Sequence, residues 1–451
     1  MEKIVVAGGT PLHGTVRASG AKNAALPILI ATLLAPGEHR LTNVPDLADV
    51  SSTLSLLGRI GCPSLVNGVV RLDTTRIAFS EAPYDVVRRM RASVLVLGPL
   101  LARCGEAKVS LPGGCAIGTR PIDQHLRGLE ALGCEFELSG GYIHGVAHDL
   151  HGADIHLDMP TVTGTENILM AATLARGTTR IFNAAREPEV VDLCHFLISL
   201  GARIEGAGTD TLVIEGVSRL RPATRAYRIL PDRIETGTYL CAAAIAGGSV
   251  EVTHTDPTLL TATLKKLEEA GCEVETTDTT VKVTRSGPLK PFSVRTEPHP
   301  GFPTDMQAQL MAVAVTAQGA SVFEETIFEN RYMHAAELRR MGADIEDHGR
   351  IATVRGVERL EGAAVMASDL RASAALVLAG LGARGRTEVL RIYHLDRGYE
   401  DMVGKLRGVG ARIGRVGDDV HDPELLDAAV GASPSLTASG VHASMAAPAQ
   451  A

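Results

Sequence analysis

Residues 263–275 read TLKKLEEAGCEVE. Leucines three positions apart predict a helix that ends before Gly271, and the alternation after the glycine predicts a strand. The same pattern, a helix ending in an apolar residue, then glycine, then alanine or cysteine, occurs six times. Its glycines are Gly61, Gly133, Gly201, Gly271, Gly342 and Gly410, with successive spacings of 72, 68, 70, 71 and 68 residues. Six copies at nearly one spacing indicate a repeat architecture.

A second signature lies upstream of the first in every copy. It is an alanine- and leucine-rich helix closed by glycine and followed by a β-branched strand, at 23–37, 91–105, 166–177, 236–247, 306–319 and 371–385. Each unit therefore reads helix, strand, loop, helix, strand, which predicts an α/β fold. The natural division is three units plus three, with the break at 219–231. Beyond about residue 420 the chain is rich in alanine, serine, glycine and proline, and we expect a disordered tail.

The loop at 111–120, LPGGCAIGTR, places Cys115 among three glycines and next to Arg120. Reactive cysteines are accessible and lie near positive charge, which favours the thiolate. The glycines and the prolines on either side also suit a mobile lid. The alternative is an ordinary turn in which the cysteine is incidental.

The rest of the composition limits the classes of function. The chain has seven cysteines, and none of them forms a C-x-x-C pair, so we expect a reducing, cytoplasmic environment without disulfides. No signal peptide and no bilayer-length apolar run is recognised, so we expect no membrane association. A net charge of −8 and 3% aromatic residues argue against nucleic-acid binding.

When the six repeats are aligned, polar residues that interrupt the apolar pattern fall at two positions of the repeat unit. The first, at the start of the upstream helix, holds Lys22, Asn23, Arg91, Thr165, Glu166, Asn167, Thr236, Thr238, Asp305 and Arg371. The second, in the loop after the following strand, holds Cys115, Arg120, Glu187, Glu189, Asp256, Arg331, Asp396 and Arg397. Helix N-termini and arginines that converge would bind phosphate or carboxylate. The threonines could equally be N-caps, whereas lysine and arginine are poor caps and favour a ligand.

Most of these residues lie in segments that closely resemble the enolpyruvyl transferase family, in the branch of UDP-N-acetylglucosamine 1-carboxyvinyltransferases. The segments are SGAKNAALPILI (19–30), RRMRAS (88–93), LPGGCAIGTRP (111–121), AREPEVVDL (185–193), LPDRIETGT (230–238), PTDMQAQ (303–309), FENRYMH (328–334), SDLRAS (368–373) and IYHLDRGY (392–399). The resemblance runs from about residue 1 to 416. It implies two domains, each a pseudo-threefold inside-out α/β barrel of three repeats, with the active site between them. The domains would comprise 21–229 and 1–20 with 230–420, and 421–451 would be the disordered tail.

The resemblance implies transfer of the enolpyruvyl group of phosphoenolpyruvate to the 3-hydroxyl of UDP-N-acetylglucosamine, the first committed step of peptidoglycan synthesis. It makes Cys115 the proton donor and the target of the epoxide fosfomycin, and Asp305 the base. Lys22, Arg91, Arg120, Arg371 and Arg397 would hold phosphoenolpyruvate. The sugar nucleotide would contact Asn23, Arg91, Arg120, Pro121, Thr161, Val162, Thr163, Thr304, Asp305 and Ile327. No metal and no cofactor is implied.

The sequence departs from the family pattern near the nucleotide. TVTGT at 161–165 stands where one family version has SVGAT, and Met159, Asp46 and Ala48 stand where that version has lysines. Transfer to another nucleotide acceptor, or a non-catalytic sugar-nucleotide sensor, are the alternatives; shikimate 3-phosphate enzymes lack the Cys115 loop. The histidines His144, His148, His151 and His156 could bind a metal, but their spacing suits a surface hairpin as well.

Overall fold

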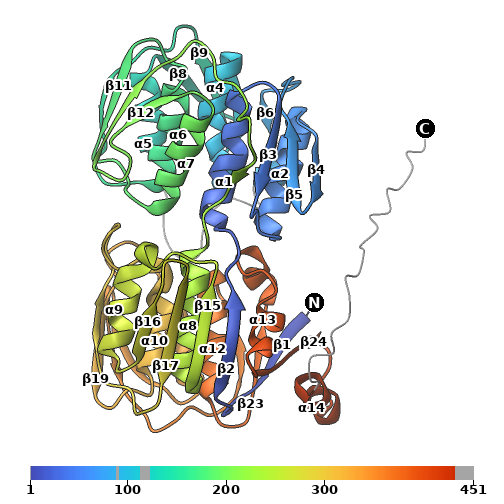
Figure 1. Cartoon of the computed structure of the whole chain (residues 1–451), viewed down its shortest axis with the longest axis vertical. Helices are drawn as coiled ribbons and strands as arrows, with labels where there is room; N and C mark the ends of the chain where they lie inside the picture. Colours follow the sequence, from blue (N-terminus) through green and yellow to red (C-terminus); the bar gives the residue numbers. More distant parts are fainter. Residues whose placement is uncertain (1, 88–90, 112–121, 432–451) are drawn as a thin grey trace, which may run out of the picture.

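The computed structural model describes residues 2–87, 91–111 and 122–431. Its helices and strands form two lobes stacked along the long axis of the molecule (Figure 1). Each lobe has its own hydrophobic core. One core is built from residues 21–229, and the other from residues 4–18 and 234–413. The proposed domain limits are 21–229 for one domain and 1–20 with 230–420 for the other. They are supported because all the residues of each core lie within a single one of these domains.

The N-terminal lobe holds three four-stranded sheets. Their strands are β3 (Glu38–Thr42), β4 (Ser64–Asn67), β5 (Val69–Asp73), β6 (Glu81–Ala82), β7 (Glu106–Ser110), β8 (Cys134–Ser139), β9 (Tyr142–Ala147), β10 (Asp154–His156), β11 (Thr178–Phe182), β12 (Arg203–Glu205), β13 (Thr211–Glu215) and β14 (Tyr227–Arg228). Its helices are α1 (Lys22–Ala31), η1 (Thr32–Leu34), α2 (Ala48–Ile60), α3 (Tyr84–Val87), η2 (Arg91–Val96), α4 (Leu97–Cys104), α5 (Asp123–Ala131), α6 (Val162–Ala172) and α7 (Pro188–Ser199).

The C-terminal lobe repeats this arrangement and includes the start of the chain. Its strands are β1 (Glu2–Ala7), β2 (Leu12–Arg17), β15 (Gly248–Thr253), β16 (Glu273–Thr276), β17 (Thr280–Arg285), β18 (Ser293–Arg295), β19 (Ala320–Glu324), β20 (Asp344–His348), β21 (Ile351–Arg355), β22 (Ala364–Met366), β23 (Arg386–Leu390) and β24 (Arg412–Gly417). Its helices are α8 (Arg233–Ala246), η3 (Pro257–Leu260), α9 (Thr261–Glu269), η4 (Thr304–Met306), α10 (Gln307–Ala314), α11 (Met333–Arg340), α12 (Leu370–Gly382), η5 (Ile392–Arg397) and α13 (Met402–Gly408).

All six sheets share one topology, in which the first two strands are parallel and the other two are added antiparallel. The orders are β14-β3-β5-β4, β6-β7-β9-β8 and β10-β11-β13-β12 in one lobe, and β2-β15-β17-β16, β18-β19-β21-β20 and β22-β23-β1-β24 in the other. The predicted six α/β repeats are therefore confirmed. Because β1 and β2 complete sheets of the C-terminal lobe, the chain crosses between the lobes just before α1 (Figure 1).

The repeat glycines explain why the sequence signature is so regular. All six have φ between 91° and 106°, the left-handed conformation that closes a helix and is accessible to glycine at little cost. Beyond their polar first turns, most of the upstream helices are apolar and buried on nearly every side, as helices inside a core must be. Every residue of α10 is buried, and α8, α10 and α12 contact one another at the centre of their lobe.

The predicted disordered tail is wrong in its first part, because Pro423–Gly431 form helix α14 at the edge of the C-terminal lobe (Figure 1). Leu426 and Val430 lie one turn apart and pack on Val5 of β1, so tertiary contact stabilises a segment that its composition made look unstructured. Residues 432–451 lie outside the described residues. In the described part of the chain, no helix has both the length and the apolar character needed to cross a membrane.

Candidate active site

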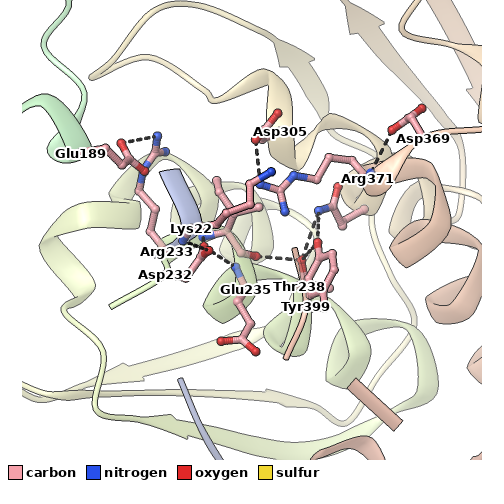
Figure 2. Close-up of polar contacts among 12 residues, drawn as sticks. Lys22, Glu189, Asp232, Arg233, Glu235, Thr238, Asp305, Asp369, Arg371 and Tyr399 are labelled. Atoms are coloured by element: carbon pink, nitrogen blue, oxygen red, sulfur yellow. Dashed lines mark hydrogen bonds and ion pairs between the residues drawn. The ribbon is translucent and has the colours of Figure 1, made fainter. Parts of the chain in front are cut away.

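Lys22 is the first residue of α1, directly after the crossover between the lobes. Its position is tied to the other lobe through Asp232, whose Oδ2 accepts a hydrogen bond from the Lys22 backbone N at 3.4 Å. Asp232 is also the N-cap of α8, where its Oδ1 accepts from Ile234 N and Glu235 N at 2.8 and 2.9 Å. One carboxylate therefore orders both the start of α8 and the residue that enters the N-terminal lobe (Figure 2).

Asp305 lies in η4, between two arginines of the C-terminal lobe. Its Oδ1 accepts from Arg331 Nη2 at 2.9 Å, and its Oδ2 accepts from Arg371 Nη2 at 2.8 Å. Burial alone would raise the pKa of Asp305, but the guanidinium groups of Arg371 and Arg331 outweigh it and hold the pKa well below its ordinary value. In this arrangement Asp305 is ionised and doubly paired.

A second carboxylate, Asp49 near the start of α2, pairs with two residues predicted to hold phosphoenolpyruvate. Arg397 Nε lies 2.9 Å from Asp49 Oδ1, and Lys22 Nζ lies 3.3 Å from Asp49 Oδ2. Since α2 and η5 belong to different lobes, this cluster bridges the two lobes. Burial lowers the pKa of Lys22, Asp49 opposes this effect, and the charges of Arg371 and Arg397 add to it.

Arg371 is anchored through its backbone and one guanidinium nitrogen, and its other guanidinium nitrogens are unpaired among the described residues. Its backbone N and that of Ala372 donate to Asp369, the N-cap of α12, and its guanidinium carbon lies 5.6 Å from the centre of the Tyr399 ring. Its buried Nε and Nη1 atoms have no hydrogen-bond partner among the described residues. Buried guanidinium donors without a partner are costly, and an anionic ligand would satisfy them.

A third buried contact joins the lobes near this cluster. Arg233 of α8 donates through Nε and Nη2 to Glu189 of α7 at 3.0 and 3.3 Å, and both side chains are at least nine-tenths buried (Figure 2). Next to it, His299 N donates to Glu187 Oε1 at 3.3 Å. Glu187 and Glu189, which repeat alignment placed at one of the two polar positions, thus connect the lobes.

The residues predicted to contact the sugar nucleotide divide between the lobes. Thr304 directly precedes Asp305 in η4, and both Thr304 and Ile327 bond to Glu325, a buried carboxylate that sequence reasoning missed. Asn23 is the second residue of α1. Thr161 is the N-cap of α6 and accepts from Gly164 N at 3.3 Å, while Val162 and Thr163 begin that helix in the N-terminal lobe.

Some predicted residues cannot be placed. Cys115, Arg120 and Pro121 lie outside the described residues. Arg91 begins η2, and only its backbone is described. The structure therefore brings together Lys22, Asp305, Arg371 and Arg397, and it leaves the thiol and the remaining arginines as predictions.

The three threonines left open between capping and ligand contact are fully buried and lie inside α6 and α8, so they do not cap these helices. Thr165 Oγ1 accepts from Ala185 N, and Thr236 bonds Thr255. Thr238 donates to Ile234 O and bonds the Tyr399 hydroxyl. Neighbouring residues, Thr161 and Asp232, make the caps instead.

Sequence reasoning missed Asp49, His125 and Glu325. Only Asp49 carried a local signal, as an acid in the first turn of a predicted helix. Within the described ranges, no group of three or more histidine, cysteine or acidic side chains is placed to hold a metal ion, so the histidine-cluster alternative gains no support.

His125 of α5 contacts two residues in the first turns of α6, Thr163 and Asn167. One ring nitrogen lies 3.2 Å from Thr163 Oγ1 and the other 3.1 Å from Asn167 Nδ2. Asn167 Oδ1 in turn accepts from Gly98 N at 2.7 Å. Desolvation lowers the pKa of His125 to about 4, with a small opposing effect from Asp123, so the ring is neutral at pH 7.

We expect His125 to make folding stability depend on pH. Its pKa is about 6.5 in the unfolded chain and about 4 in the fold, so the unfolded state takes up the proton first as pH falls. The contribution is full above pH 6.5 and is lost progressively towards pH 4, at a cost of up to about 3 kcal/mol. Denaturant unfolding of wild type and His125→Gln between pH 4.5 and 7.5 should show a flatter pH dependence in the variant. His148→Gln, at an exposed histidine, is the control; equal slopes in all three proteins would contradict the assignment.

Two lobes, each of three units with the same sheet topology, and paired carboxylates and cations at their junction define the architecture of an enolpyruvyl transferase. The family model described as EPSP synthase (3-phosphoshikimate 1-carboxyvinyltransferase) matches residues 6–406, and the chain belongs to this family. Among solved structures, the enolpyruvyl transferase NikO from Streptomyces tendae aligns with a TM-score of 0.83 at 26% identity, covering 92% of this chain and 99% of its own. EPSP synthase from Acinetobacter baumannii, at 17% identity and a TM-score of 0.73 over 92% of this chain and 100% of its own, shares the fold.

Curated relatives are more similar in sequence. A UDP-N-acetylglucosamine 1-carboxyvinyltransferase from Nitratidesulfovibrio vulgaris is 57% identical over 417 residues, 92% of this chain and 100% of that protein. One from Geotalea daltonii is 54% identical over the same shares of both chains. The predicted family and the predicted fold are confirmed.

Proposed function

We propose that the chain transfers the enolpyruvyl group of phosphoenolpyruvate to the 3-hydroxyl of UDP-N-acetylglucosamine and releases phosphate, the first committed step of peptidoglycan synthesis. The observation that carries this proposal is the 54–57% identity to relatives of that name along their whole length. The paired cations Lys22, Arg371 and Arg397 support it, because the donor substrate carries a phosphate and a carboxylate. A cytoplasmic location is proposed with it, in keeping with six described free cysteines.

The chemistry requires an addition and then an elimination. In the addition, C3 of phosphoenolpyruvate takes a proton, the sugar oxygen bonds to C2 and the hydroxyl proton leaves to a base. In the elimination, the bond from C2 to the phosphate oxygen breaks and C3 loses a proton. Positive charge develops at C2 within each step, and the fixed cations hold the carboxylate and phosphate of the donor and stabilise the phosphate as it leaves. We assign the acid to Cys115 and the base to Asp305.

Asp305 needs to change its partners before it can act as that base. Paired with Arg331 and Arg371, its pKa lies too low for it to take a proton readily. An anionic substrate that binds the unpartnered Nε and Nη1 of Arg371 would share this guanidinium with Asp305. Sharing weakens the pairing and raises the pKa of Asp305, so substrate binding would itself activate the base.

The substrate test is direct. The protein is mixed with phosphoenolpyruvate and, separately, UDP-N-acetylglucosamine, UMP or shikimate 3-phosphate, and released phosphate is measured. Of these three acceptors, we expect only UDP-N-acetylglucosamine to cause phosphate release from phosphoenolpyruvate. Release with a different nucleotide would support the alternative acceptor, and binding of the sugar nucleotide without release would support a sensor.

Cys115 is expected to carry both the proton-transfer function and the sensitivity to fosfomycin. A carboxylic acid can deliver a proton but resists alkylation by an epoxide, whereas serine is too weak an acid to replace a thiol of pKa about 8.5. Cys115→Asp should therefore stay active and become insensitive to fosfomycin, and Cys115→Ser should lose most turnover. Mass spectrometry should find the adduct on Cys115 in the wild type, with Cys104→Ser as the control. An adduct on Cys104 or Cys194 together with an active Cys115→Ser protein would refute the assignment.

A further inference from the structure

Glu325 lies just after β19 and is only 1% exposed, yet among the described residues its carboxylate contacts no cation. Instead, four hydrogen bonds converge on it. Oε1 accepts from Ile327 N at 2.9 Å, Phe328 N at 3.1 Å and Thr296 Oγ1 at 3.0 Å, and Oε2 accepts from Thr304 Oγ1 at 2.9 Å. The two backbone N–H groups can only donate, so they define Oε1 as an acceptor.

The orientation of the neighbouring hydroxyls follows from these contacts. Thr296 Oγ1 accepts from Thr326 N at 2.9 Å, which leaves its proton for Glu325. Thr304 has one hydroxyl proton, and it points to Glu325 Oε2. The oxygen lone pairs of Thr304 are therefore what this half-buried side chain can offer to a ligand.

The same edge of the site carries a second acceptor. Asp305, the residue after Thr304, is an ionised carboxylate with its side chain 28% exposed. An edge formed by an acceptor-only Thr304 and a carboxylate matches ligand groups that donate, namely hydroxyl or amide N–H groups on neighbouring atoms of a sugar ring. It disfavours a ligand that presents an ether or carbonyl oxygen there, because two acceptors would face each other.

We propose that Glu325 is a positioning residue that makes Thr304 an obligate acceptor and so selects an acceptor substrate with a hydrogen-bond donor at this edge. The inference rests on the proposed function for the identity of the substrate. Glu325 would act on the sugar nucleotide and not on phosphoenolpyruvate. The described candidate cations for phosphoenolpyruvate, Lys22, Arg371 and Arg397, pair with other carboxylates, Asp49 and Asp305.

Glu325→Gln reverses the direction of the hydrogen bond between residue 325 and Thr304 while preserving the shape of the site. The glutamine oxygen would keep the bonds from Ile327 N and Phe328 N, because turning its NH₂ towards these donors would leave both unsatisfied. Its NH₂ group would then donate to Thr304, whose proton would turn towards the substrate. We expect the KM for UDP-N-acetylglucosamine to rise about 10-fold, with the KM for phosphoenolpyruvate changed by less than about 2-fold.

A double-mutant cycle separates this role from a structural one. Thr304→Ala removes the group through which Glu325 acts, so adding Glu325→Gln to it should raise the KM for the sugar nucleotide no further. Thr304→Ser keeps the hydroxyl and should raise the KM for the sugar nucleotide less than Thr304→Ala does. Glu324→Gln, a more exposed carboxylate one residue away, is the matched control and should change neither KM. Thermal unfolding of each variant checks that it is folded under the conditions in which its KM is measured.

The outcomes are distinct. Additive losses in the double variant, an unchanged KM in Glu325→Gln, or an equal rise in the KM for phosphoenolpyruvate would overturn the role of Glu325 and leave the proposed function standing. If Glu325→Gln does not fold, the Thr304→Ser and Thr304→Ala pair decides, because equal KM values in those two variants would overturn it. No phosphate release by wild type with UDP-N-acetylglucosamine would overturn both proposals.

Discussion

Lys22→Ala is expected to lower kcat/KM for phosphoenolpyruvate by about 10²- to 10³-fold, the scale of losing one fixed charge from a preorganised site. The Lys22 side chain is only 12% exposed, and the charges of Arg371 and Arg397 lie close enough to lower its pKa, so its ammonium group acts where screening by water is weak. Folding should be retained, because Asp49 keeps its bonds to Arg397 Nε and Nη2 at 2.9 and 3.4 Å.

The measurement is steady-state phosphate release with each substrate varied in turn. Lys282→Ala is the matched control, since Lys282 makes an exposed surface pair with Glu275 and such pairs contribute little. The assignment predicts a loss concentrated on phosphoenolpyruvate, with little change in the binding of UDP-N-acetylglucosamine. Wild-type turnover in Lys22→Ala would remove this residue from the anion site.

Asp305→Asn is expected to lower kcat by about 10²- to 10⁴-fold, the range associated with loss of a general base. The substitution keeps the size of the side chain, but asparagine cannot take the proton of the sugar hydroxyl. It also removes the charge that pairs with Arg331 and Arg371. Because those two guanidinium groups then face each other without a carboxylate between them, the variant should bind inorganic phosphate at least as tightly as the wild type.

Kinetics and a phosphate-binding titration together test both parts of this prediction. Asp344→Asn is the control, because Asp344 also pairs with an arginine, Arg355, at an exposed site where both side chains are 52% exposed. A kcat within a few-fold of wild type would show that Asp305 is not the base. Weaker phosphate binding would show that the arginines depend on Asp305 for their position.

The sequence determined the repeat architecture and most of the anion site. The repeat glycines have left-handed φ values, and the central helices are rich in alanine and leucine beyond their first turns; both patterns depend on residues a few positions apart. Lys22, Arg371 and Arg397 could be predicted because lysine and arginine have no reason to stand at otherwise apolar repeat positions. The tail was misread over 423–431, since its stability depends on Val5 at the other end of the chain.

Only the tertiary structure decided what these residues bind. Asp49 and Arg397 are 348 positions apart, and Asp305 and Arg371 are 66 apart. No pattern in the sequence pairs them, because helix and turn signals reflect local dihedral preferences, whereas an ion pair depends on where the two lobes place their helix ends. The bond from Thr304 to Glu325, 21 positions away, arose in the same way, when η4 and the segment after β19 came together. The sequence thus determined which charges are present, and the packing of the lobes decided which carboxylate holds each of them and which donors stay free for a substrate.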